Sequence, residues 1–81
     1  MDLYFNIGDV FKEDDKKWYI YKIDKEDVEY PYEVFPLVFK KYLDIDCDDT
    51  LYEILTECGY RRCMSEREIF IAKIESIYGK R

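Results

Sequence analysis

Carboxylates, thiols and amines must carry whatever chemistry this chain can perform, because it contains no histidine. The side chain best suited to proton transfer near neutral pH is therefore missing. Ser-His and Cys-His nucleophilic pairs and histidine-containing metal sites are excluded with it. The three glycines, Gly8, Gly59 and Gly79, stand far apart, so the chain has no glycine-rich phosphate loop. We expect a protein that is not an enzyme and has no catalytic residues.

An aspartate-rich segment invites comparison with a calcium-binding loop. Asp44, Asp46 and Asp48 occupy the spacing of the first three ligands of an EF-hand. The glycine needed at the sixth position is Asp49, and the bidentate glutamate needed at the twelfth is Leu55. Aspartates at the start of a helix explain the cluster more simply, because they favour its positive end. We expect no metal and no cofactor.

The three cysteines point to a reducing compartment. Their odd number, in a chain without a signal peptide, argues against a secreted disulfide scaffold. Cys58 and Cys63 approach the spacing of zinc ligands, but only Cys47 remains to complete a set of four. We expect Cys58 to be a small buried apolar residue. The predicted location is the cytoplasm, either of the protein's own cell or of an infected host.

Three arginines support an alternative hypothesis, a small regulatory DNA-binding module. Arg61, Arg62 and Arg67 surround the start of the last predicted helix, where contacts to phosphates would be useful. The connection at 59–64 is longer than the usual turn of a helix-turn-helix motif, which weakens this hypothesis. Direct nucleic-acid binding is therefore disfavoured.

Tyrosines near carboxylates are the strongest functional indication in the sequence. Aromatic residues make up 19% of the chain and include nine tyrosines, more than the centre of so small a core can hold. Tyrosine is enriched in protein interfaces because it combines a large apolar ring with a polar tip. The candidate partner-binding residues are Glu13, Asp14, Asp15, Tyr19, Tyr21, Asp24, Glu26, Asp27, Glu29, Tyr30 and Tyr32.

Charge is unevenly distributed along the chain. Residues 1–49 contain 14 acidic residues and 7 lysines, whereas residues 50–81 contain 5 acidic and 6 basic residues, and the whole chain has a net charge of -6. The N-terminal part should repel a phosphate backbone and attract a basic protein surface. The leading hypothesis is a protein-binding domain whose acidic residues gather into one patch and dock on such a surface, blocking a nucleic-acid site. Carboxylates that only keep the domain in solution, and a self-associating structural subunit, are the alternatives.

In size, charge and aromatic content the chain resembles small acidic inhibitors encoded by phages and mobile elements, including anti-CRISPR and DNA-mimic proteins. Bacterial immunity proteins against nuclease toxins are similar in the same respects. The resemblance includes no motif, so it implies an inhibitor but assigns no functional residue.

The elements that must position these residues begin with strands. Leu3, Phe5, Ile7 and Phe11 alternate along the chain and predict a strand at about 3–11. The segment 18–23 predicts a second strand, joined to the first as an antiparallel hairpin across the polar residues 12–16. It is apolar on both faces, so its tyrosines either lie exposed or lie under a third element. The stretch 30–36 contains two prolines, Pro31 and Pro36, and predicts a short extended segment at about 29–35, which we expect at a sheet edge.

Helical spacing then predicts three helices, at about 36–44, 50–58 and 65–78. Thr50 with Glu53 and Ser65 with Glu68 have the spacing of capping boxes. We expect the last helix to bury one stripe against the core, formed by Phe70, Ile71, Ile74, Ile77 and Tyr78. No apolar run approaches the roughly 18 residues of a membrane helix. The prediction is one α+β domain spanning 1–81, with its helices on one face of an antiparallel ribbon.

Overall fold

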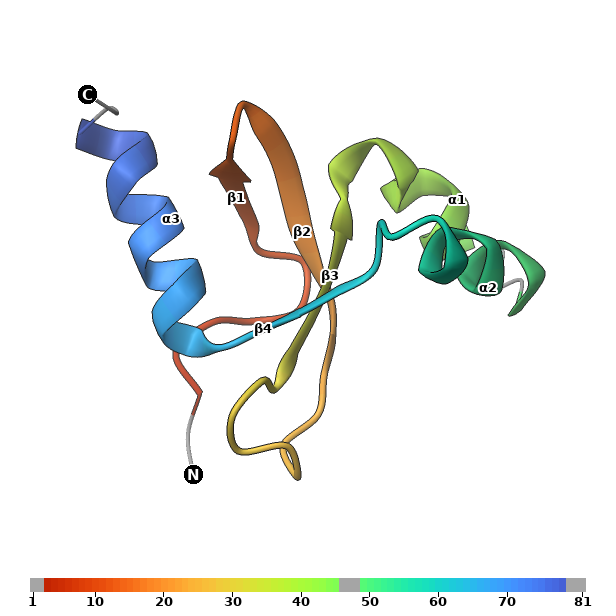
Figure 1. The fold of residues 1–81 in the computed structure, drawn as a ribbon, viewed down its shortest axis with the longest axis horizontal. Coiled ribbons are helices and arrows are strands. Elements are labelled where there is room, and N and C mark those ends of the chain that lie inside the picture. Colours follow the sequence, from red (N-terminus) through yellow and green to blue (C-terminus); the bar gives the residue numbers. More distant parts are fainter. Residues whose placement is uncertain (1–2, 46–48, 79–81) are drawn as a thin grey trace.

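The structure is a computed structural model that describes residues 3–45 and 49–78. In this part of the chain, four strands form one antiparallel sheet in sequence order (Figure 1). The strands are β1 (Val10–Glu13), β2 (Lys16–Ile23), β3 (Tyr32–Pro36) and β4 (Arg62–Met64). The helices are the 3-10 helix η1 (Leu37–Phe39), α1 (Lys40–Ile45), α2 (Asp49–Glu57) and α3 (Glu66–Tyr78). The predicted α+β class is confirmed.

The predicted hairpin is present, but its first strand begins at Val10 rather than at residue 3. The segment before it turns instead, because the Asp9 carboxylate accepts the backbone N–H of Asn6 at 2.9 Å and Gly8 has a φ of 95°. Asp14 and Asp15 connect β1 to β2 with φ values of 52° and 63°. Two positive φ values in a two-residue connection match the twist of a hairpin.

The segment expected at a sheet edge is an inner strand. β3 lies between β2 and β4, and all five of its residues are buried. The strand that covers its outer side, β4, falls within the region 59–64, which the sequence predicts as a connection. Tyr32 lies opposite Met64 and Val34 opposite Arg62. Three residues are too few to produce a recognisable alternation, so β4 leaves no pattern in the sequence.

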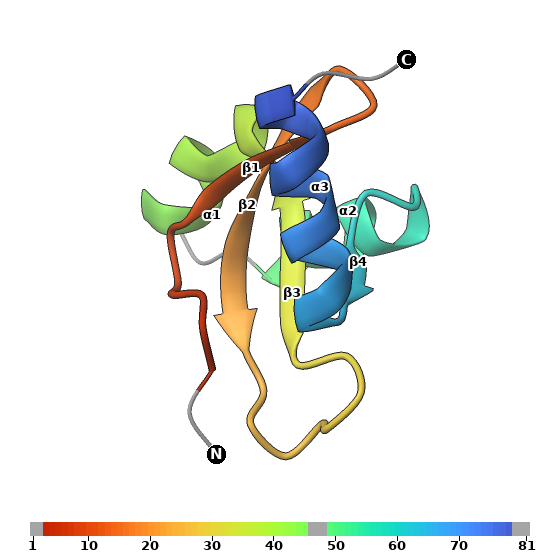
Figure 2. The same cartoon turned by 90° about the vertical axis from the view of Figure 1, so that its left-hand side faces the viewer.

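The helices cover both faces of the sheet, not one face as expected. α3 lies on one side and α1 with α2 on the other (Figures 1 and 2). Facing α3, the core is formed by Phe5, Phe11, Trp18, Ile20, Tyr32, Val34, Met64, Ile69 and Ala72. On the opposite face it is formed by Tyr19, Phe35, Leu43 and Leu55. Consecutive residues of a strand point to opposite faces, so this arrangement explains why β2 is apolar throughout.

The predicted helices are present with shifted starts. The helix expected at 36–44 is divided into η1 and α1. α2 buries Leu55, whereas Ile54 is 50% exposed and Cys58 is exposed, so the expectation that Cys58 is buried was wrong. Before α3, the Ser65 hydroxyl accepts the N–H of Glu68 at 3.1 Å and the Glu68 carboxylate accepts that of Ser65 at 2.9 Å. This capping box is confirmed. None of the described helices has the length and apolar character needed to cross a membrane.

Candidate functional site

The apolar residues of α3 lie on two sides of the helix. Ile69 and Ala72 are buried against the sheet, with exposed fractions of 0% and 3%. The stripe predicted to be buried points to solvent instead, and this expectation was wrong. Its exposed fractions are 46% for Phe70, 44% for Ile71, 40% for Ile74, 75% for Ile77 and 79% for Tyr78.

The N-terminal segment extends this apolar stripe. Tyr4 is 71% exposed, and its ring centroid lies 6.0 Å from that of Phe70 and 5.0 Å from that of Phe5. Its backbone N–H donates to Oε2 of Glu66, at the start of α3, at 2.6 Å. The segment is therefore fixed beside the helix. We call the six residues Tyr4, Phe70, Ile71, Ile74, Ile77 and Tyr78 the α3 surface.

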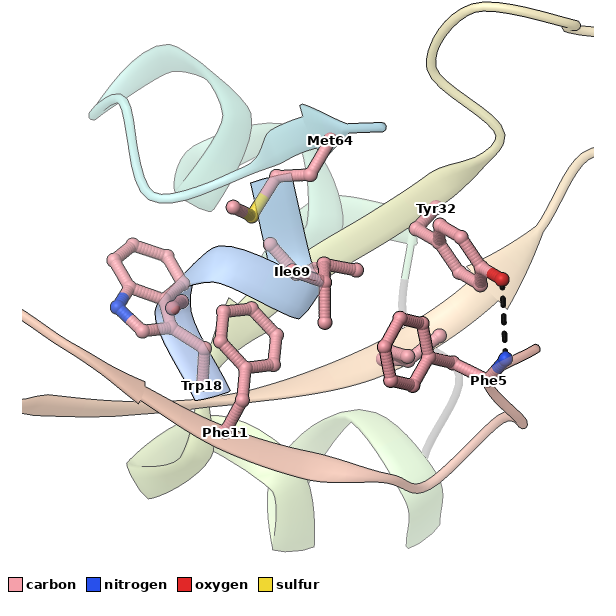
Figure 3. Close-up of a cluster of buried hydrophobic side chains, with 9 residues drawn as sticks. Phe5, Phe11, Trp18, Tyr32, Met64 and Ile69 are labelled. Carbon is pink, nitrogen blue, oxygen red and sulfur yellow. Dashed lines mark hydrogen bonds between the residues drawn. The ribbon is translucent and has the colours of Figure 1, made fainter. Parts of the chain in front are cut away.

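Tyr32 of β3 is hydrogen-bonded to the same segment at Phe5 (Figure 3). The backbone N–H of Phe5 donates to the Tyr32 hydroxyl oxygen at 3.2 Å, and this hydroxyl donates to Oε2 of Glu66 at 2.9 Å. Burial raises the pKa of Tyr32 above its ordinary value, and the hydrogen bond to Glu66 raises it further. The neutral hydroxyl thus joins β3, the N-terminal segment and α3.

A shallow depression lies within the α3 surface. It has a volume of about 390 Å³ and is lined by Tyr4, Phe5, Asp9, Phe70, Lys73, Ile74 and Ile77. The Lys73 ammonium lies 5.2 Å from the centroid of the Phe5 ring. Acidic side chains stand beside the apolar residues, with Asp9 in the depression and Glu68 and Glu75 exposed along α3. The depression itself is lined by one carboxylate, Asp9, and one ammonium, Lys73, so its apolar residues are its main binding feature.

The predicted acidic residues do not form one patch. Asp14 and Asp15 lie at the tip of the β1–β2 hairpin, at the opposite end of β2 from Asp24 (Figure 1). Eight residues of strand separate the two ends by about 23 Å. Glu13, next to the hairpin tip, forms an ion pair with Arg62. The acidic residues of β1 and of the β2–β3 loop therefore form two groups at opposite ends of β2.

The predicted partner-binding tyrosines are also divided. Tyr19 and Tyr32 have exposed fractions of 1% and 0%, so they contribute to the core and cannot contact a partner docked on the surface. Tyr21 is half-buried and packs at right angles against Phe35, with ring centroids 5.4 Å apart. Tyr30 is 48% exposed in the β2–β3 loop. The predicted acidic residues of the same loop are Asp24, Glu26, Asp27 and Glu29, all of them exposed.

The arginines of the DNA-binding alternative are not placed for it. Arg61 Nε lies 3.0 Å from Oε1 of Glu33, and Arg62 pairs with Glu13. The hydrogen bond to Glu33 raises the pKa of Arg61. Arg67 is exposed. α2 and α3 lie on opposite faces of the sheet, so they do not pack together as the two helices of a helix-turn-helix motif do.

Cysteines and carboxylates do not gather into a metal site within residues 3–45 and 49–78. Cys58 and Cys63 are exposed and not joined by a disulfide. The acidic segment compared with a calcium loop lies partly, and Cys47 wholly, outside the described residues.

Comparison of the chain with models of protein families, with curated proteins and with solved structures finds no match in any of the three. The chemistry of the surface therefore carries the functional argument alone. Sequence reasoning identified the α3 apolar residues but assigned them to the core. One signal could have placed them correctly: Ile69 and Ala72 lie on the other side of the same helix.

Proposed function

We propose that the protein is a non-enzymatic protein-binding domain, which docks through the α3 surface on a partner that presents an apolar patch beside basic groups. The exposure of Phe70, Ile71, Ile74, Ile77 and Tyr78 is the observation that carries this proposal. Apolar side chains lie on two sides of α3, and the described residues cover only the side of Ile69 and Ala72.

The size of the α3 surface suits a protein interface. A large side chain contributes about 150–250 Å² when it is covered, so the exposed fractions of the six residues amount to roughly 600 Å². The largest apolar patch of a typical monomer covers about 300–600 Å². A stable interface buries about 800 Å² on each partner. The α3 surface therefore provides most of the contact area that one partner needs.

Charge selects the kind of partner. The net charge of the chain is -6; Asp9 and Lys73 line the depression, and Arg67, Glu68 and Glu75 are exposed along α3. A partner with basic groups around its apolar patch would be attracted from a distance and held by the apolar contact. Where the basic surface of the partner binds nucleic acid, docking of this domain blocks that binding. The domain then acts as a cytoplasmic inhibitor of the partner.

Affinity capture with matched variants tests the proposal. The tagged wild-type protein, the variant Ile71→Asp/Ile74→Asp and the control Ile54→Asp are used as baits, and captured proteins are quantified by mass spectrometry. Ile54 is 50% exposed on α2, on the opposite side of the sheet. We expect one basic protein that the wild type and the control retain and the α3 variant loses.

Two results would contradict the proposal. In the first, every protein captured by the wild type is captured equally by the α3 variant. In the second, the protein that only the α3 variant fails to capture is acidic. The inhibitor role has its own readout, which is nucleic-acid binding by the purified partner. The wild-type domain should abolish this binding, and the α3 variant should leave it intact.

A further inference from the structure

A second apolar depression lies away from the α3 surface. It is a groove of about 540 Å³, between the start of β2, the end of β3, η1 and the α2–β4 connection, and it is lined by Lys16, Lys17, Pro36, Leu37, Val38, Phe39 and Tyr60. Val38 is 68% exposed, and the rings of Phe39 and Tyr60 lie 5.4 Å apart. The volume falls in the range of about 300–1,000 Å³ typical of ligand sites.

Lysines gather around this groove, at the β1–β2 hairpin end of an otherwise acidic protein. Lys17 of the groove lies directly opposite Lys12 on the neighbouring strand, and like charges in this position destabilise a sheet. The Lys40 ammonium lies on the same face, 5.8 Å from the centroid of the Tyr19 ring. With Lys16, which lies opposite Glu13, these are four lysines, against Glu13 and the two aspartates of the hairpin turn. A carboxylate-bearing occupant would relieve the repulsion between the lysines.

The β2–β3 loop, residues 24–31, has the complementary chemistry. The Asp24 carboxylate accepts the N–H of Glu26 at 3.0 Å, and the Asp27 carboxylate accepts that of Tyr30 at 3.0 Å. These turns fix the backbone of the loop, and they leave Val28 78% exposed among the acidic residues. A fixed loop loses little conformational entropy when it binds.

We infer that the Lys16–Lys17 groove binds the acidic β2–β3 loop of a second copy of this chain, with Val28 against the apolar floor and carboxylates beside the lysines. The loop and the groove lie at opposite ends of β2, about 23 Å apart, so one molecule cannot fill its own groove. The contact is head-to-tail, and such contacts build rings or open chains. This inference is independent of docking through the α3 surface.

Sedimentation equilibrium of the full chain at rising concentration tests the inference. We expect the wild type to associate below about 1 mM and to associate more weakly when salt is raised, because screening acts on the ionic contacts. Lys16→Glu/Lys17→Glu reverses the charge of the groove. Glu26→Lys/Glu29→Lys reverses the charge at two positions of the loop and keeps the aspartates that fix its backbone. Each variant alone should associate at least about tenfold more weakly, because like charges then meet.

A mixture of the two variants provides the decisive control. The variant Lys16→Glu/Lys17→Glu retains an intact loop, and the variant Glu26→Lys/Glu29→Lys retains an intact groove. Their mixture should therefore regain association that neither variant shows alone. The variant Ile71→Asp/Ile74→Asp should associate like the wild type. A monomeric wild type, unaffected association in either charge variant, a mixture that stays monomeric, or association lost with the α3 variant would each overturn the inference. Association lost with the α3 variant would instead assign self-association to the α3 surface, whereas the other three results have no consequence for capture of a basic partner.

Discussion

Two isoleucines of α3, two residues apart, should differ sharply in what they contribute to stability. Ile69 is 0% exposed and packs against the sheet, whereas Ile71 is 44% exposed on the outer side. The substitutions Ile69→Ala and Ile71→Ala remove the same three carbon atoms from the same helix. Helix propensity changes equally in both, so the difference between them measures burial.

The expected losses follow from the exposed fractions. At about 0.8 kcal/mol per buried methylene, the carbons removed from Ile69 are worth about 2.4 kcal/mol, and the cavity adds about 1 kcal/mol. Ile71 loses about 1.3 kcal/mol, because only about half of its surface is covered. Alanine returns about 0.4 kcal/mol of helix propensity at each position. We expect net losses of about 3 kcal/mol for Ile69→Ala and about 1 kcal/mol for Ile71→Ala.

Urea unfolding followed by tryptophan fluorescence measures both values. Trp18 is the single tryptophan, and it is buried in the core cluster that contains Ile69. Equal slopes of the unfolding free energy against urea would show that the comparison is between like states. If Ile71→Ala costs as much as Ile69→Ala in dilute protein, the outer side of α3 is covered in the monomer. The placement of α3, and with it the proposed docking surface, would then be wrong.

Three further predictions concern the turn, the cap and the buried hydroxyls. Asp15→Gly should raise the free energy of unfolding by about 0.5 kcal/mol, because glycine adopts the φ of 63° without strain; a loss in urea unfolding would contradict this. Ser65→Ala should lose about 1 kcal/mol, a fall in Tm of about 4–8 °C by calorimetry, whereas an unchanged Tm would show that the cap contributes nothing. Burial first, and then hydrogen bonds to Glu66 and Glu33, raise the pKa values of Tyr32 and Tyr52 above 10.0. Stability held by the protonated rings is thus complete below pH 10 and declines above it, so Tyr32 and Tyr52 should ionise above pH 10.0 in an absorbance titration, together with unfolding. Ionisation of both rings below pH 10.0 without unfolding would contradict this.

The parts of the fold that neighbouring residues determine could be predicted from sequence. The capping box of Ser65 and Glu68 marks the start of α3 within one residue, and the β-prone segment 18–23 lies within β2. Both depend on contacts between residues a few positions apart. The hairpin follows in the same way, because its turn requires only that Asp14 and Asp15 accept positive φ values.

The parts that depend on distant contacts could not be predicted. α3 has apolar residues on both sides, and periodicity alone favours the longer stripe, that of Phe70 and Ile74. The sheet instead receives Ile69 and Ala72, the side that fits against Phe11 and Trp18. Likewise, the acidic residues are close in sequence but separated in space, because the length of β2 places its two ends far apart.

The layered architecture explains why an apolar surface remains open. The sheet is covered by α3 on one face and by α1 and α2 on the other, so α3 is itself an outer layer. Among the described residues, no further element lies over the outer side of α3. For the docking proposed above, the net charge of -6 favours a basic partner over an acidic one, while the apolar side chains of the α3 surface supply the contact.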